Sequence, residues 1–163
     1  MKKRLLAAVG GIALILSPAA AMAVDTYSAQ LSGADEVPPR ATDAFGTIVV
    51  SHFPGLGRAR FTLDVRRATA ILSAVGGHIH CAPAGANGPI VVFLAGEASP
   101  GGFDGRLSIS GMIDDDNVIP GSACGDTLAE LLTAAAAGNA YVNLHSTTFP
   151  GGEIRGQLML EAP

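Results

Sequence analysis

The chain has 163 residues, of which 48% are hydrophobic, with two cysteines and no tryptophan. Its ten Lys and Arg residues are outnumbered by 14 Asp and Glu, and three of the ten lie within the first four residues, which leaves seven arginines for the rest of the chain. This acidic remainder argues against nucleic acid and against an anionic membrane surface as partners, because both attract a basic face.

The first 23 residues have the features of a secretory signal peptide. Lys2-Lys3-Arg4 makes a positive start, an apolar run extends from Leu5 to Leu16, and Ala21-Met22-Ala23 is an A-x-A cleavage site. The apolar run is shorter than the roughly 20 residues that span a bilayer; the alternative is an uncleaved membrane anchor. We expect a leader over 1–23, a periplasmic or secreted product without membrane insertion, and one domain over 24–163.

The rest of the chain alternates between short β-type segments and turns rich in Gly and Pro. Alternating polar and apolar residues predict strands at 26–33, 58–65 and 105–112, and apolar or β-branched runs predict strands at 45–52, 71–80, 89–95, 140–145 and 153–160. Pro38 and Pro39 exclude a central strand around them, because proline donates no backbone hydrogen bond. The pattern predicts a mainly β fold, an antiparallel β-sandwich or Greek-key barrel of about eight strands with one short helix.

That helix is predicted after residue 126. Thr127 and Glu130 have the spacing of a capping box. Apolar residues then recur at helical spacing, at Leu128, Leu131, Leu132 and Ala135. Gly138 is typical of a helix exit.

The two cysteines, Cys81 and Cys124, are expected to form a disulfide, because an even number of cysteines in an exported chain usually does. The alternative is that both bind a metal ion, but neither lies in a C-x-x-C pair.

Three of the four histidines are candidates for a metal site. His78 and His80 lie two residues apart on a predicted strand, so their side chains share a face, and Ile79 between them points to the core. The same alternation places His145 on an outer face. Three imidazoles from two strands suit copper or zinc if the strands are neighbours; the alternative is partly exposed histidines that bond to loop carbonyls. The fourth, His52, is expected to be a surface or loop residue.

Polar residues near these histidines are candidates for their outer partners. Asn143 shares the predicted face of His145, and Glu153 and Arg155 share one face of the last predicted strand. The latter two form either a surface ion pair or a covered pair that orients the loop 146–152 or hydrogen-bonds to a histidine.

Signatures of catalysis are missing from the sequence. It contains no G-x-S-x-G elbow, no H-E-x-x-H helix and no phosphate-binding glycine loop before a helix. No catalytic residue is therefore predicted, and a binding protein is favoured over an enzyme.

Several segments together resemble the CHRD domain, which is named for its occurrence in chordin. They are, in family order, Leu31–Pro39, Gly77–His80, Asn87–Val92, Tyr141–His145 and Pro150–Leu158. The resemblance implies a secreted β-rich domain, often alone after a signal peptide, and no established activity.

A more distant likeness connects His78, His80 and His145, a later arginine and a disulfide with the copper half of Cu/Zn superoxide dismutase. The bridging and zinc-loop histidines of that family have no counterpart here. Two hypotheses follow: a non-catalytic binding or envelope module of unknown partner, and a periplasmic metal-binding protein that holds copper through these three histidines. A single-copper redox enzyme is a further alternative, which would need an open coordination position.

Overall fold

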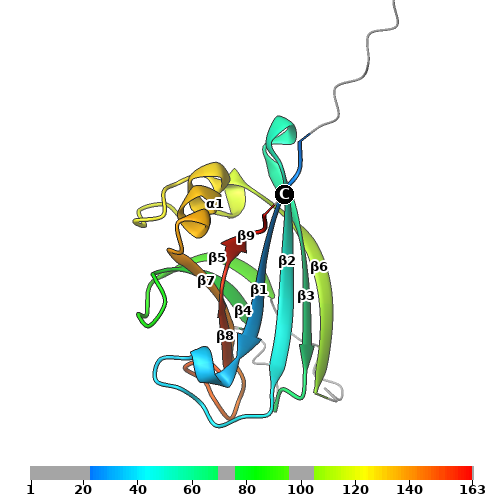
Figure 1. Cartoon of the computed structure of the whole chain (residues 1–163), viewed down its shortest axis with the longest axis vertical. Coiled ribbons are helices and arrows are strands. Elements are labelled where there is room, and N and C mark those ends of the chain that lie inside the picture. Colours follow the sequence, from blue (N-terminus) through cyan, green and yellow to red (C-terminus); the bar gives the residue numbers. More distant parts are fainter. Residues whose placement is uncertain (1–22, 70–75, 96–104, 163) are drawn as a thin grey trace, which may run out of the picture.

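The computed structural model describes residues 23–69, 76–95 and 105–162. Within these ranges the chain forms nine strands, one α-helix and three 3₁₀ turns (Figure 1). The strands are β1 (Asp25–Ser32), β2 (Phe45–Phe53), β3 (Arg58–Arg66), β4 (Gly77–Cys81), β5 (Ile90–Ala95), β6 (Arg106–Asp114), β7 (Ala140–Leu144), β8 (Ile154–Gln157) and β9 (Met159–Leu160). The helix is α1 (Leu128–Ala136), and the turns are η1 (Gly33–Asp35), η2 (Pro54–Leu56) and η3 (Asp115–Asn117).

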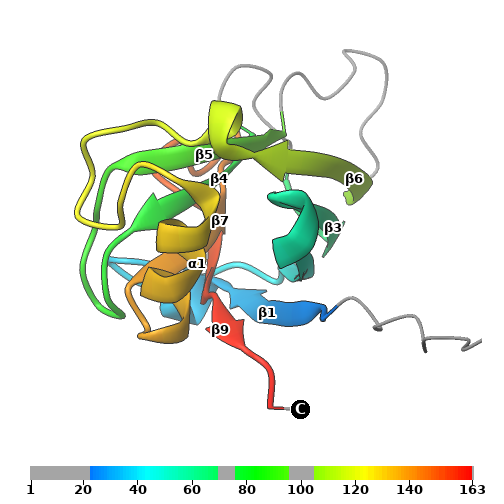
Figure 2. The same ribbon diagram turned by 90° about the horizontal axis from the view of Figure 1, so that it is seen from above.

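All nine strands belong to one antiparallel sheet. Its order is β5-β4-β7-β8-β1-β2-β3-β6, and β9 also pairs with β1. The sheet curls so far that its two ends approach each other, as Figure 2 shows from above. The backbone N–H of Ile119, after η3, donates to the carbonyl of Val91 on β5 at 2.9 Å. The predicted mainly β, barrel-like fold with one helix is confirmed.

Aliphatic side chains fill the inside of the curled sheet. The alternation predicted for β1 and β3 holds, because Leu31 and Leu63 are buried with the other inward residues of their strands, whereas Arg60 is exposed. Burial of each such leucine contributes about 1.5–3 kcal/mol. Helix α1 packs against β7 and β9 and covers part of this core. The residues predicted for its apolar face are all buried: Leu128, Leu131, Leu132 and Ala135.

The ends of α1 are those that the sequence predicts. The Thr127 hydroxyl accepts from the backbone N–H of Glu130 at 3.3 Å, and the Glu130 carboxylate accepts from the backbone N–H of Thr127 at 3.1 Å. This capping box satisfies two N–H groups that a helix start otherwise leaves without partners. Gly138 then turns the chain with a φ of 78°, a left-handed conformation that favours glycine.

The strands predicted at 45–52 and 153–160 differ in detail from those in the structure. His52 was expected to be a surface or loop residue, but it is only 8% exposed on β2, because it continues the inward alternation of Ile48 and Val50. The predicted final strand is two strands, since the chain leaves β7 at Leu158 and continues along β1 as β9. The first part of the strand predicted at 71–80 lies outside the described residues.

The predicted leader also lies outside the described residues, except for residue 23. Among the residues that the structure describes, no helix has the length and hydrophobicity needed to cross a bilayer.

Candidate metal centre

The sheet order brings the candidate histidines together. β4 pairs with β7, and β7 pairs with β8, so residues of the same parity form rows across the three strands. One row contains His78, Asn143 and Arg155. The next contains His80, Tyr141 and Gln157. The condition for a joint histidine site, that the two strands be neighbours, is therefore met.

The imidazoles of His78, His80 and His145 converge. One nitrogen of each ring lies within 4.8 Å of those of the other two. Ring centroids are 5.0 Å apart for His78 and His145, and 5.5 Å apart for His78 and His80. His78 is fully buried and His80 is 7% exposed. They point away from the core as predicted, yet they are covered, so the alternative of partly exposed rings is wrong for these two.

The strand pairing around these histidines is irregular. β4 and β5 shift register between Gly77 and His78, and again between Ile79 and His80. Such bulges re-aim side chains and are common beside functional sites. On the β5 side, the ring of Phe93 meets that of His78 edge to face at 5.0 Å.

Two loop carbonyls fix the protonation of the rings. His80 Nδ1 lies 2.9 Å from the carbonyl oxygen of Gly88, and His145 Nδ1 lies 3.0 Å from that of Pro150. A carbonyl only accepts, so each Nδ1 carries the hydrogen and each Nε2 keeps a free lone pair. Neither Nε2, nor either ring nitrogen of His78, has a hydrogen-bond partner within the described part of the chain. Neutral imidazoles with free lone pairs and carbonyl partners are typical metal ligands.

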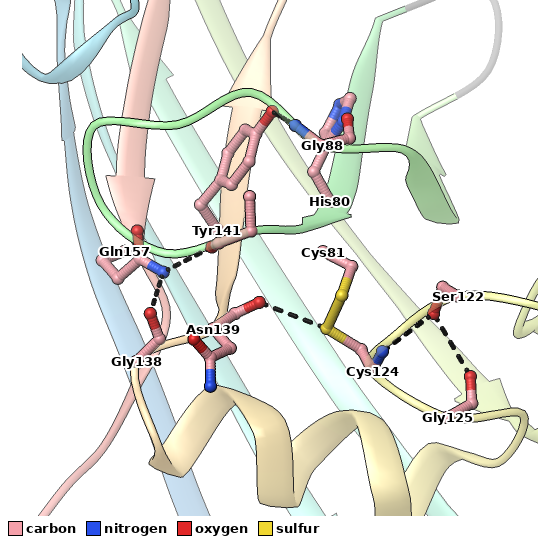
Figure 3. The surroundings of a disulfide bond; sticks show 11 residues. His80, Cys81, Gly88, Ser122, Cys124, Gly125, Gly138, Asn139, Tyr141 and Gln157 are labelled. Atoms are coloured by element: carbon pink, nitrogen blue, oxygen red, sulfur yellow. Dashed lines mark hydrogen bonds between the residues drawn. A yellow bond between two sulfur atoms is a disulfide. The ribbon is translucent and has the colours of Figure 1, made fainter.

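The predicted disulfide is present next to this site. Cys81 follows His80 directly and is joined to Cys124, with a Cα–Cα distance of 5.8 Å (Figure 3). Beyond the disulfide the chain turns back, and the N–H of Cys81 donates to the carbonyl of Pro89 at 3.0 Å. A Cβ on Gly88 would clash with the carbonyl oxygen of Cys81, so only glycine fits at the position whose carbonyl bonds to His80.

Arg155 organises the loop that covers His80. It is 1% exposed, and its guanidinium carbon lies 3.4 Å from the ring centroid of Tyr141. The Tyr141 ring in turn stacks on His80 at 4.7 Å, with 8° between the ring planes. The guanidinium donates to three acceptors of the loop: Pro83 O at 3.2 Å, Ala86 O at 2.7 Å and Asn87 Oδ1 at 3.2 Å. Arg155 therefore fixes both the loop and the aromatic ring that contact His80.

Glu153 anchors the turn that carries Pro150, as Arg155 anchors the loop over His80. Its carboxylate, fully buried, accepts from the hydroxyl of Thr42 at 2.8 Å, and from the N–H and hydroxyl of Thr69 at 3.3 and 3.1 Å. The Thr69 hydroxyl lies 3.0 Å from that of Ser146, where the turn begins. Of the two alternatives for Glu153 and Arg155, the surface ion pair is thus wrong, because each residue is buried and anchors a separate loop.

Sequence reasoning missed Glu36. This residue follows η1 and is 4% exposed, and one of its carboxylate oxygens has no hydrogen-bond partner among the described residues. Burial raises the pKa of Glu36, although Val37, Arg155 and Asn143 act to lower it. Glu36 belongs to the motif Leu31–Pro39. The residues around it, which include two prolines, form no pattern that would predict burial of its carboxylate.

The electrostatics of the site keep its histidines neutral. Burial lowers the pKa of His78 from 6.5 to about 4, and repulsion from His145 and His80 adds to the effect. Burial also lowers the pKa of His80 and of His145, against the hydrogen bonds to Gly88 and Pro150. Neutral imidazole is the form that binds metal ions.

The free energy of unfolding of the metal-free protein is expected to fall as the pH falls. Between pH 6.5 and 4 the unfolded chain takes up a proton at residue 78 and the folded chain does not, so the stability present above pH 6.5 is lost on acidification. For His78 alone the loss from pH 7 to pH 5 is about 2 kcal/mol. His80 and His145 act in the same direction, and Glu36 in the opposite one.

Urea unfolding in the presence of a chelator at several pH values would measure this slope. His78→Leu is the matched control, because it removes the titrating group and keeps the site apolar. Equal slopes for the variant and the unchanged protein would contradict the expectation.

Comparison with known proteins places these residues in a family context. A family model described as the CHRD domain matches residues 27–158. The match includes the three histidines, both cysteines and all the segments on which the resemblance was based. No curated protein and no solved structure matches the chain, so the likeness to superoxide dismutase has no structural match behind it.

Proposed function

Because the chain belongs to the CHRD-domain family, a family of non-enzymatic modules of extracellular type, we propose that it is an exported binding module that holds one transition-metal ion through His78, His80 and His145. Copper(II) is the first candidate for that ion. Export is supported by the N-terminal sequence and by the disulfide, since disulfides persist in oxidising compartments.

One observation carries the metal proposal: in three converging histidines, both ring nitrogens of His78 and the Nε2 atoms of His80 and His145 have no hydrogen-bond partner among the described residues. A buried polar group left without a hydrogen bond costs about 1–3 kcal/mol. Both ring nitrogens of His78 lack a hydrogen-bond partner among the described residues, and the ring is completely buried. A metal ion bound to one lone pair of each ring offsets that cost.

The donor set agrees with copper(II) or zinc rather than with a thiolate-bound ion. Imidazole suits both of these metals, and neither cysteine is available because both are in the disulfide. The carbonyls of Gly88 and Pro150 provide the outer hydrogen bonds that ligand histidines usually make.

The test is a metal titration of the protein purified from the periplasm. We expect one equivalent of copper(II) per chain and a nitrogen-coupled EPR spectrum. His80→Ala should weaken binding by more than about 100-fold, which is the upper effect expected for loss of an outer partner alone. His52→Gln is the matched control, because His52 is also buried but pairs with Asp25, 3.4 Å away, outside the cluster.

Two results would remove the proposal. One is the absence of stoichiometric metal in protein whose disulfide is intact. The other is an affinity of the His80→Ala variant equal to that of the His52→Gln variant.

A further inference from the structure

We propose that the side-chain oxygen of Asn143 is a fourth ligand, which closes the coordination shell of the metal ion. This inference rests on the trihistidine site proposed above, and it assigns to Asn143 a direct contact with the ion rather than the position of an outer partner.

The position of Asn143 places it within reach of the ion. It lies on β7 directly opposite His78 on β4, and both side chains are on the same face of the sheet. Directly opposed residues of antiparallel strands have Cβ atoms about 4.5–5.5 Å apart. Asn143 is 4% exposed, and its Oδ1 has no hydrogen-bond donor among the described residues. A buried amide oxygen of this kind needs a donor or a cation.

Glu36 determines which end of the amide faces the histidines. The Asn143 side chain lies beside the buried carboxylate of Glu36 and lowers its pKa. An ionised carboxylate only accepts, so it takes the NH₂ end of the amide. The amide oxygen of Asn143 is therefore the end that faces His80, the other neighbour of this side chain.

At His80 two acceptors then face each other. Nδ1 of this ring is bonded to Gly88, so the edge left for Asn143 is that of Nε2, which carries a lone pair and no hydrogen. Two buried acceptors side by side repel each other unless a positive charge lies between them. A metal ion bonded to the three imidazoles supplies that charge, and the amide oxygen completes a set of three nitrogens and one oxygen.

Such a shell has a chemical consequence. Four protein ligands around zinc or a similar divalent ion form a closed, structural type of site, whereas catalytic sites keep one position for water or substrate. The inference therefore predicts a metal ion that is held without access for small anions, in agreement with a non-catalytic module.

The experiment loads the full mature chain with cobalt(II), whose visible absorption reports coordination number, and adds azide. The spectrum of the unchanged protein should not respond to azide. Asn143→Ala removes the oxygen and leaves space, so its cobalt spectrum should shift with azide, and its metal affinity should fall roughly 10- to 100-fold. Gln157→Ala is the matched control, because Gln157 is an amide on the same face whose Nε2 donates to the carbonyls of Ala82 and Gly138.

The outcomes separate the two proposals. An azide response of the unchanged protein, or an Asn143→Ala variant that remains silent to azide with unchanged affinity, overturns the fourth ligand. If Asn143→Ala does not fold, Asn143→Asp replaces it; this variant keeps an oxygen and should stay silent to azide, and a response would overturn the inference. Failure of cobalt and copper to bind the unchanged protein would instead refute the trihistidine site itself.

Discussion

Loss of the Cys81–Cys124 disulfide is expected to lower the free energy of unfolding by about 4 kcal/mol. The two cysteines are 43 residues apart, and the cross-link removes the corresponding loop entropy from the unfolded chain. A loss of this size is a large part of the 5–15 kcal/mol that typically stabilises a domain. Because Cys81 adjoins His80, the copper affinity of the cysteine-free chain should also fall.

Urea unfolding of the metal-free protein with and without a thiol reductant would measure the loss. The variant with Cys81→Ala and Cys124→Ala serves as the control, since reductant should not shift its transition. The same variant, free of reductant, is the one for metal titration. Coincident transitions of the oxidised and reduced protein would show that the covalent link adds nothing to stability.

Replacement of Arg155 by leucine is expected to cost about 3 kcal/mol of stability and to weaken metal binding roughly 10- to 100-fold. Without the guanidinium, the acceptors on Pro83, Ala86 and Asn87 lose their buried donor. The stack on Tyr141 is lost as well. The stability and the metal affinity of Arg155→Lys should lie between those of the unchanged protein and of Arg155→Leu, because an ammonium keeps the charge but not the planar set of donors.

Unfolding in urea and copper titration of the two variants test this expectation together. Arg60→Leu is the matched control, because Arg60 is an exposed arginine on β3 and its replacement should change stability by less than about 0.5 kcal/mol. If Arg155→Leu behaves like Arg60→Leu in both measurements, the loop over His80 does not depend on the buried guanidinium.

The faces of the strands could be predicted from the sequence because alternation is a local property. Side chains two residues apart share a face whatever the rest of the chain does, so the common orientation of His78 and His80 follows from their spacing. The helix beginning at Leu128 was also predictable, since its capping box and its apolar spacing lie within one short segment.

The neighbours of each strand could not be predicted in this way. That β4 lies between β5 and β7 depends on contacts between residues far apart in sequence, and no local pattern encodes them. The same limit explains Glu36, whose burial results from loops that meet only in the folded chain, and His52, which lies at the end of its predicted strand but faces inward.

The pairing of β1 with β8 and β9 has a consequence for how the molecule is made. The first strand of the sheet needs the last two as neighbours, and a chain synthesised from its N-terminus supplies these at the end. Until then β1 and β7 each have an edge of unpaired backbone groups, and long-range pairings of this kind form slowly. The order of the strands thus makes closure of the sheet between β8 and β1 a late event, whereas His145, which follows β7, can join the other two histidines as soon as β7 pairs with β4.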